Sequence, residues 1–120
     1  MVRVQFVQHR GVSILKVDFS HLTKIEESIA LLREATAIIS KQQPRSVRLL
    51  TDVTGAAFNP KGVEELKRFS AAATPFVKAS AAIGVSGLGR VIFEAVIKFI
   101  GRNIASFDTE AEALDWLANH

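Results

Sequence analysis

The spacing of apolar residues along this 120-residue chain switches several times between a repeat of two and a repeat of three to four. In residues 2–6 and 12–19 alternate positions are apolar, which is typical of half-buried β-strands. From residue 23 to residue 43 the apolar positions recur at the helical spacing. Residues 46–52 and 77–85 are short apolar runs that are typical of buried central strands. This alternation predicts an α/β protein.

Turn and capping residues divide the chain into elements. Gly11 permits a tight turn between the first two strands. Thr23 with Glu26 forms a predicted capping box, as does Thr109 with the glutamate three residues later. Asn59, followed by a proline, is a predicted N-cap. The predicted order is ββαβαβαβα, with strands over residues 2–6, 12–19, 46–52, 77–85 and 103–107, and helices over residues 23–43, 60–73, 88–102 and from Thr109 onward.

This order predicts a mostly parallel five-stranded sheet covered by helices, in one domain over residues 1–120. The chain contains no cysteine, which excludes thiolate catalysis and cysteine-ligated metal and favours a reducing, cytoplasmic setting. We also expect no membrane span, because the longest apolar region, residues 91–100, is interrupted by Glu94 and Lys98 and falls short of about 20 residues. The net charge of +3 is too small to identify a partner.

No catalytic constellation is found among the motifs. Ser86 lies in a sharp strand-to-helix turn after Gly84, but Leu88 stands where a nucleophile elbow requires glycine. The neighbouring glycines lack the third glycine of a dinucleotide fingerprint. The three histidines lack metal-ligand spacing, and the basic residues are dispersed without interleaved aromatic residues. We therefore predict no enzyme activity, no cofactor, no metal and no nucleic-acid partner.

Two helix starts that follow strands form a candidate anion site; the alternative is that the glycines before the helix at residue 88 only allow a tight turn and close packing of helix on strand. Free backbone N–H groups at such helix starts attract anions, and ligands of open parallel sheets bind at this edge. The candidate binding residues lie in these two loops and the helix starts that follow: Asp52, Thr54, Asn59, Lys61, Ser86 and Arg90. For Asp52 an alternative role is to accept hydrogen bonds from nearby loop N–H groups.

The helix over residues 88–102 is amphipathic. Its charged residues recur every four positions: Arg90, Glu94, Lys98 and Arg102. Its predicted core face consists of Leu88, Ile92, Val96, Phe99 and Ile100. Beside the charged stripe lie Val91, Phe93 and Ile97. These flanking residues either extend the contact with neighbouring helices or form an interface with a second subunit, a partner or a lipid.

Two segments carry a family resemblance: LTDVTGAAFNPKGV at residues 50–63 and FDTEAEALDWL at residues 107–117. With the element order, they resemble the STAS-like, SpoIIAA-like small bacterial proteins, most closely an uncharacterised branch that ends in a similar segment. In STAS anti-sigma-factor antagonists, a strand ending in aspartate leads to an Asp-Ser-Ser-Gly-Leu loop whose second serine is phosphorylated by a partner kinase. Asp52 matches the strand-end aspartate, whereas Lys61 takes the place of the phosphorylated serine.

The resemblance implies a non-enzymatic binding or interaction module with a regulatory role, which lacks the phosphorylatable serine. Its partner is expected to be another protein or a second copy of the chain, with an anionic or apolar small molecule as a further candidate ligand. The alternative is a small apolar-ligand or lipid carrier. A carrier requires an internal cavity, whereas an interaction module requires a filled core and an exposed apolar patch.

Overall fold

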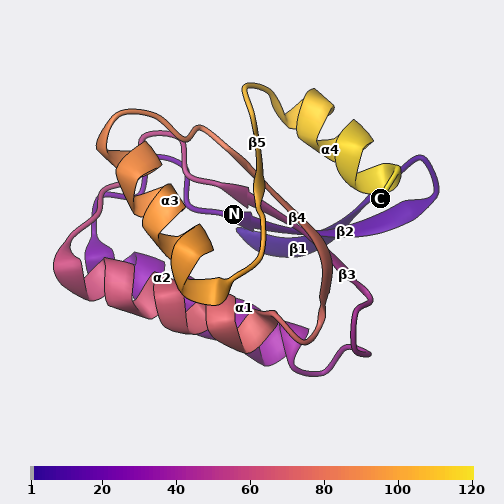
Figure 1. The fold of residues 1–120 in the computed structure, drawn as a ribbon, viewed down its shortest axis with the longest axis horizontal. Helices are drawn as coiled ribbons and strands as arrows, with labels where there is room; N and C mark the ends of the chain where they lie inside the picture. Colours follow the sequence, from indigo (N-terminus) through magenta and orange to yellow (C-terminus); the bar gives the residue numbers. More distant parts are fainter. Residues whose placement is uncertain (1) are drawn as a thin grey trace.

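The computed structural model describes residues 2–120 and contains one sheet and four helices within that range (Figure 1). The strands are β1 (Val4–His9), β2 (Val12–Asp18), β3 (Val47–Asp52), β4 (Val77–Ile83) and β5 (Ala105–Phe107). The helices are α1 (Ile25–Ile39), α2 (Pro60–Ala73), α3 (Leu88–Ile100) and α4 (Glu110–Ala118). The predicted order ββαβαβαβα is confirmed.

The five strands lie in chain order across the sheet. β1 and β2 are antiparallel, and the remaining neighbours are parallel. Arg10 and Gly11 join the first two strands, with φ values of 53° and 76°. A two-residue hairpin turn whose central residues both have positive φ matches the natural twist of the strands. The turn expected at Gly11 is therefore confirmed, and the carboxyl ends of β2 to β5 share one edge.

Helices α1 and α2 cover one face of the sheet (Figure 1). Leu15 and Leu49 from the central strands pack there with Leu32 of α1 and Phe69 of α2. Burying one such side chain contributes about 1.5–3 kcal/mol relative to leaving it exposed. This face holds the larger of the two apolar cores.

Helix α4 covers the opposite face and contacts all five strands. Its Ala113 and Leu117 are fully buried against Ile14, Leu50 and Ala81 of the sheet. The small residues of β4 let α4 approach the sheet closely. The sheet is thus buried on both faces, as the apolar run at residues 77–85 indicated.

The capping box predicted at Thr23 is wrong. Helix α1 begins at Ile25 after Lys24, whose side chain makes no capping hydrogen bond. The preceding segment instead pairs with the β3–α2 loop, because the Leu22 carbonyl accepts from the Ala57 N–H at 2.9 Å. This contact between loops far apart in sequence, which no local pattern encodes, fixes where α1 begins.

The N-caps predicted at Asn59 and Thr109 are confirmed, but the Glu112 carboxylate accepts from the Thr109 hydroxyl and not from the Thr109 N–H, as a full capping box requires. Asn59 Oδ1 accepts a hydrogen bond from the Gly62 N–H at 2.7 Å. Thr109 Oγ1 accepts from the Glu112 N–H at 3.2 Å and donates to the Glu112 carboxylate at 2.9 Å. Each cap satisfies one of the N–H groups that a helix start leaves without an intrahelical partner.

Helix α3 is oriented differently from the prediction. It packs chiefly against α2, and within Leu88–Ile100 Val96 alone is buried. Leu88 and Phe99 were expected in the core but are exposed, so that part of the predicted core face is wrong. Arg102 was expected on the charged stripe but donates hydrogen bonds into the interior. Because α3 rests on a neighbouring helix, only a narrow side of it faces the sheet.

Candidate functional site

The β3–α2 and β4–α3 loops run tightly against each other at the carboxyl edge of the sheet. The Val53 N–H donates to the Ile83 carbonyl at 3.0 Å. Gly84 has a φ of +78°, and a Cβ built on it would lie 2.1 Å from Thr54 Oγ1. Only glycine fits there without displacing the β3–α2 loop. The sequence placed Thr54 in a binding cleft, and the structure packs it against the neighbouring loop.

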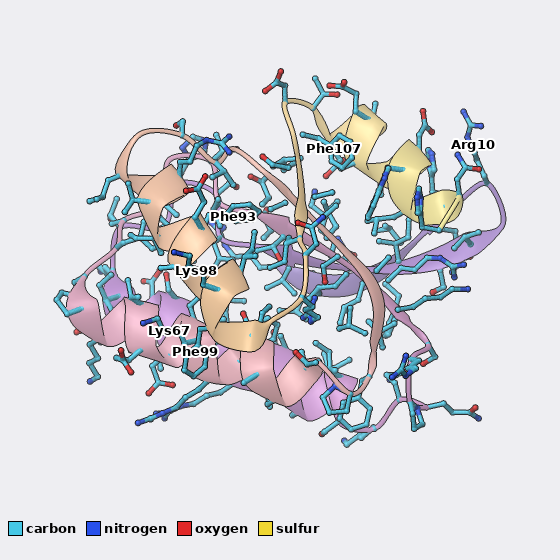
Figure 2. The ribbon with its side chains drawn as sticks, in the orientation of Figure 1. Arg10, Lys67, Phe93, Lys98, Phe99 and Phe107 are labelled. Atoms are coloured by element: carbon cyan, nitrogen blue, oxygen red, sulfur yellow. The ribbon has the colours of Figure 1, made fainter. Side chains whose placement is uncertain are left out.

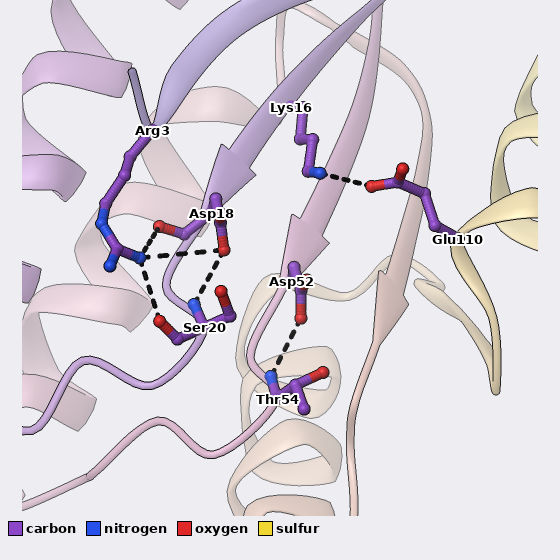
Figure 3. Close-up of polar contacts among 7 residues, drawn as sticks. All are labelled: Arg3, Lys16, Asp18, Ser20, Asp52, Thr54 and Glu110. Atoms are coloured by element: carbon purple, nitrogen blue, oxygen red, sulfur yellow. Dashed lines mark hydrogen bonds and ion pairs between the residues drawn. The ribbon is translucent and has the colours of Figure 1, made fainter. Parts of the chain in front are cut away.

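Two further candidates are engaged by the fold itself. Asp52 Oδ1 accepts a hydrogen bond from the Thr54 N–H at 3.0 Å, a turn that Figure 3 shows at the end of β3. This is the alternative role considered for Asp52. The Asn59 side chain caps α2, as described above. Both side chains therefore shape the loop, because Asp52 Oδ1 and Asn59 Oδ1 each accept a hydrogen bond from the loop backbone or the helix start.

The remaining three candidates are exposed at the same edge. Ser86 lines a hollow between the two loops, and Asn59 lines an adjoining one, with Leu88 in the wall of both. Arg90 Nη2 donates to the Val85 carbonyl at 3.2 Å. Lys61 is exposed in the first turn of α2. The structure thus places polar groups around Leu88.

A polar cluster that the sequence did not predict lies on the α4 face of the sheet (Figure 3). Lys16 of β2 pairs with Glu110 at the start of α4. The hydrogen bond to Glu110 raises the pKa of Lys16, against the opposing effect of burial. A lysine of raised pKa stays protonated at neutral pH and is a poor base or nucleophile. The pair attaches α4 to the sheet.

Asp18 is the second ionised member of this cluster. Burial acts to raise its pKa, but hydrogen bonds from Ser20 and the charges of Lys16 and Arg3 outweigh burial, so the pKa lies below its ordinary value. The Ser20 N–H donates to Asp18 Oδ1 at 2.9 Å. Arg3 donates to the carbonyls of Asp18 and Ser20 at 3.1 and 3.0 Å. This arrangement secures the end of β2 and holds no open ligand position.

An exposed apolar face runs along α3. Leu88, Val91 and Phe99 are 71%, 65% and 59% exposed. Ala95 is also exposed and Ile92 is half-buried, and the spacing of the five residues places them on one side of the helix. We call these five residues the α3 patch. Phe58 and Val63 extend it across a groove toward α2.

Cations lie beside this apolar face. Lys67 Nζ of α2 stands 5.6 Å from the centroid of the Phe99 ring, and Figure 2 shows Lys98 on the same helix as Phe99. The residues predicted to flank the charged stripe are not equivalent. Val91 belongs to the α3 patch and Ile97 is half-buried, whereas Phe93 lines an internal cavity beneath α3. Leu88 and Phe99 were missed as surface residues because their helical spacing matched a core face.

Within residues 2–120, no three His, Asp or Glu side chains are grouped so that they could share a metal ion. No helix in the same range is long and apolar enough to cross a membrane.

Two solved structures share this fold. An anti-sigma-factor antagonist (STAS) domain protein from Planctomyces limnophilus superposes with a TM-score of 0.62 at 15% identity, covering 98% of both chains. An uncharacterised protein from Shewanella loihica PV-4, of the DUF3478 family with a SpoIIAA-like fold, superposes with a TM-score of 0.63 at 21% identity. That match covers 95% of this chain and 91% of the other. No family model and no curated protein matches the sequence.

The chain therefore has the SpoIIAA/STAS-like α/β fold, as the sequence predicted. At these identities the likeness establishes the arrangement of strands and helices. What the module binds has to be argued from its own surface.

Proposed function

We propose that this protein is a non-catalytic regulatory interaction module that binds a partner protein through the α3 patch. The observation that carries the proposal is the run of large apolar side chains exposed on successive turns of α3: Leu88, Val91 and Phe99. A contiguous apolar face bordered by charged residues is typical of a protein interaction site. The lack of cysteine supports a reducing, cytoplasmic setting for this module.

The charges around the patch favour a partner that carries carboxylates. The cations on α3 and the side of α2 that faces it are Lys67, Arg90 and Lys98, and the acidic residues there are Glu64 and Glu94, so the border has three positive and two negative charges. A second copy of the chain would bring two such cationic borders together, which is unfavourable. An apolar side chain flanked by acidic residues fits both the patch and its border. We therefore expect a heterologous acidic partner.

The loops at the carboxyl edge supply the polar rim of this surface. Ser86 offers a donor in the hollow that Leu88 also lines, and Lys61 and Arg90 are exposed in the first turns of α2 and α3. Asp52 and Asn59 hold the backbone of the β3–α2 loop. At Lys61 there is no hydroxyl to phosphorylate. Partner binding by this module is therefore independent of phosphorylation at that position.

The apolar-ligand carrier is less well supported by the shape of the interior. The two most recessed pockets are about 30 and 60 Å³. Sites for drug-sized ligands are about 300–1,000 Å³, and a long lipid chain needs comparable room. The exposed patch and the nearly filled core favour the interaction module.

The test starts by trapping the partner with a photo-reactive residue at Val91 and then purifies the trapped protein. Its affinity is measured by calorimetry for three forms: the native chain, the double variant Leu88→Ser/Phe99→Ser, and Val2→Ser. Val2 is also an exposed apolar residue but precedes β1, away from the patch. We expect the double variant to bind at least about 30-fold more weakly, as loss of a central apolar anchor implies. The Val2→Ser control should bind as the native chain does.

Native mass spectrometry of the isolated chain gives the second readout. A monomer is expected, together with an affinity for the partner that falls as salt is raised. A dimer that the double variant abolishes would assign the α3 patch to a second copy and overturn the heterologous partner. Equal partner affinity in all three forms would overturn the docking surface itself.

A further inference from the structure

A small cavity lies between the sheet, α2 and α3. Its volume is about 60 Å³, which is more than the 10–15 Å³ or so that one water molecule needs. Most of its wall is apolar, with Leu66 and Phe69 from α2 and Phe93 and Val96 from α3. Arg102 is the one charged residue among those lining it within residues 2–120. An apolar cavity that includes a single cation requires an explanation.

Arg102 reaches the cavity from the segment after α3. Its Nε donates to Thr74 Oγ1 at 3.0 Å, and its Nη1 donates to Ser80 Oγ at 2.8 Å. Both acceptors are neutral hydroxyls. None of the ion pairs formed within residues 2–120 involves Arg102. Because a guanidinium has five N–H donors, part of its hydrogen-bonding capacity stays unused by these residues.

This arrangement leaves a positive charge partly removed from water without a counter-ion. Burial lowers the pKa of Arg102, and no neighbouring carboxylate opposes that effect. A desolvated charge is costly unless it is paired, and two hydroxyl acceptors offset only part of that cost. Ser70 and Ser80, the two buried polar residues of the core, both lie in the cavity wall. Thr51 also lines the cavity, so the wall combines several hydroxyl groups and one cation with apolar side chains.

We propose that this cavity binds a small monocarboxylate with a short apolar chain. The carboxylate would pair with the Arg102 guanidinium, whose planar donors match two carboxylate oxygens, and the chain would lie against Phe69, Phe93 and Val96. The volume of about 60 Å³ limits the ligand to a few heavy atoms, and we take butyrate as the longest chain to test. A single cation and an apolar wall disfavour phosphate and other dianions. The site is separate from the α3 patch, which lies on the outer side of the same helix.

The proposal is tested by titrating the isotope-labelled protein with butyrate and following amide and Arg side-chain signals by NMR. The native chain should show saturable shifts at residues lining the cavity. Butanol, which has the same chain length and no charge, should bind at least 10-fold more weakly. Arg102→Met should weaken butyrate binding at least 10-fold. The matched control, Arg33→Met, removes an exposed cation on α1 and should bind butyrate as the native chain does.

A chain-length series on the native protein keeps the test independent of whether Arg102→Met folds. Affinity should rise from acetate to butyrate and fall for octanoate, which exceeds the cavity. Affinity that rises steadily to octanoate would show adsorption to an apolar surface and overturn the proposal. Equal binding of butyrate and butanol would also overturn it, as would saturable shifts confined to residues outside the cavity.

Discussion

Gly84 lies where the β3–α2 and β4–α3 loops pack against each other at the carboxyl edge of the sheet. Its φ of +78° is a conformation that other residues adopt at a cost, and its missing side chain leaves room for Thr54. Gly101, just after α3, has a similar φ of +70°, but a Cβ there would meet nothing within 4 Å. The two glycines thus separate the cost of backbone conformation from the cost of a steric clash.

Replacing each glycine by alanine should reveal that difference. Gly101→Ala should lower the free energy of unfolding by about 1 kcal/mol, the cost of a positive φ alone. Gly84→Ala should lower it by about 2–4 kcal/mol, because displacing the Thr54 loop adds to that cost. Urea denaturation of the two variants and the native chain measures both values. Equal losses would mean that the Thr54 loop moves aside freely.

Asp18 should make stability depend on pH in the acid range. Its pKa is lower in the folded chain than in the unfolded chain. The stabilisation is therefore fully present above the unfolded pKa, near 3.9, and is lost as the pH falls through the folded value. We expect Asp18→Asn to reduce the decline in unfolding free energy between about pH 5 and pH 2. Urea denaturation across this range, with Asp108→Asn as an exposed control, checks it, and parallel curves for all three forms would contradict it.

Helices α3 and α4 have similar apolar content but bury it differently. Leu117 of α4 is fully buried, whereas Leu88 of α3 is exposed. Leu88 is the first residue of α3, and Leu117 lies near the end of α4. Because both residues are leucines, the same substitution compares the two environments directly. The comparison also tests whether the outer side of α3 belongs to the surface or to the core.

Leu117→Ala should lower the free energy of unfolding by about 2–5 kcal/mol, through lost burial and the cavity left behind. Leu88→Ala should change it by no more than about 0.5 kcal/mol, as is usual for surface positions. Thermal and urea unfolding of both variants measure the difference. A large loss for Leu88→Ala would return that residue to the core and remove it from the α3 patch.

The sequence predicted that α3 exists but not which side of it faces inward. Apolar residues occur almost all round this helix, including Val91, Ile92, Phe93 and Val96. Periodicity then permits more than one core face, and the choice depends on how the helix packs against α2. In α1, by contrast, Ile29, Leu32 and Ile39 recur at the helical spacing and all three are buried. The error at α3 therefore fell on the residues that form the proposed docking surface.

At the scale of the whole molecule, the sheet and the order of its elements were predictable from alternating periods and turn residues. Contacts between distant side chains were not. His9 Nε2 lies 2.6 Å from Asp115 Oδ1, and Arg10 Nε lies 3.1 Å from the same atom, across more than a hundred residues of chain. The Arg102 contact with Ser80 also joins two elements, across 22 residues of chain. Such pairs depend on the final packing of helices on the sheet, which local patterns do not encode.

Helix α4, which buries one face of the sheet, follows all five strands in the chain. Ile14, Leu50 and Ala81 have all been synthesised before the ribosome reaches α4, the helix that buries them. During that interval, a growing chain would present an open apolar surface, of the kind that chaperones recognise and that promotes aggregation. Synthesis proceeds at about 5–20 residues per second, so this exposure is brief under normal translation. A ribosome stalled after β5 would prolong the time for which this sheet face lacks the cover of α4.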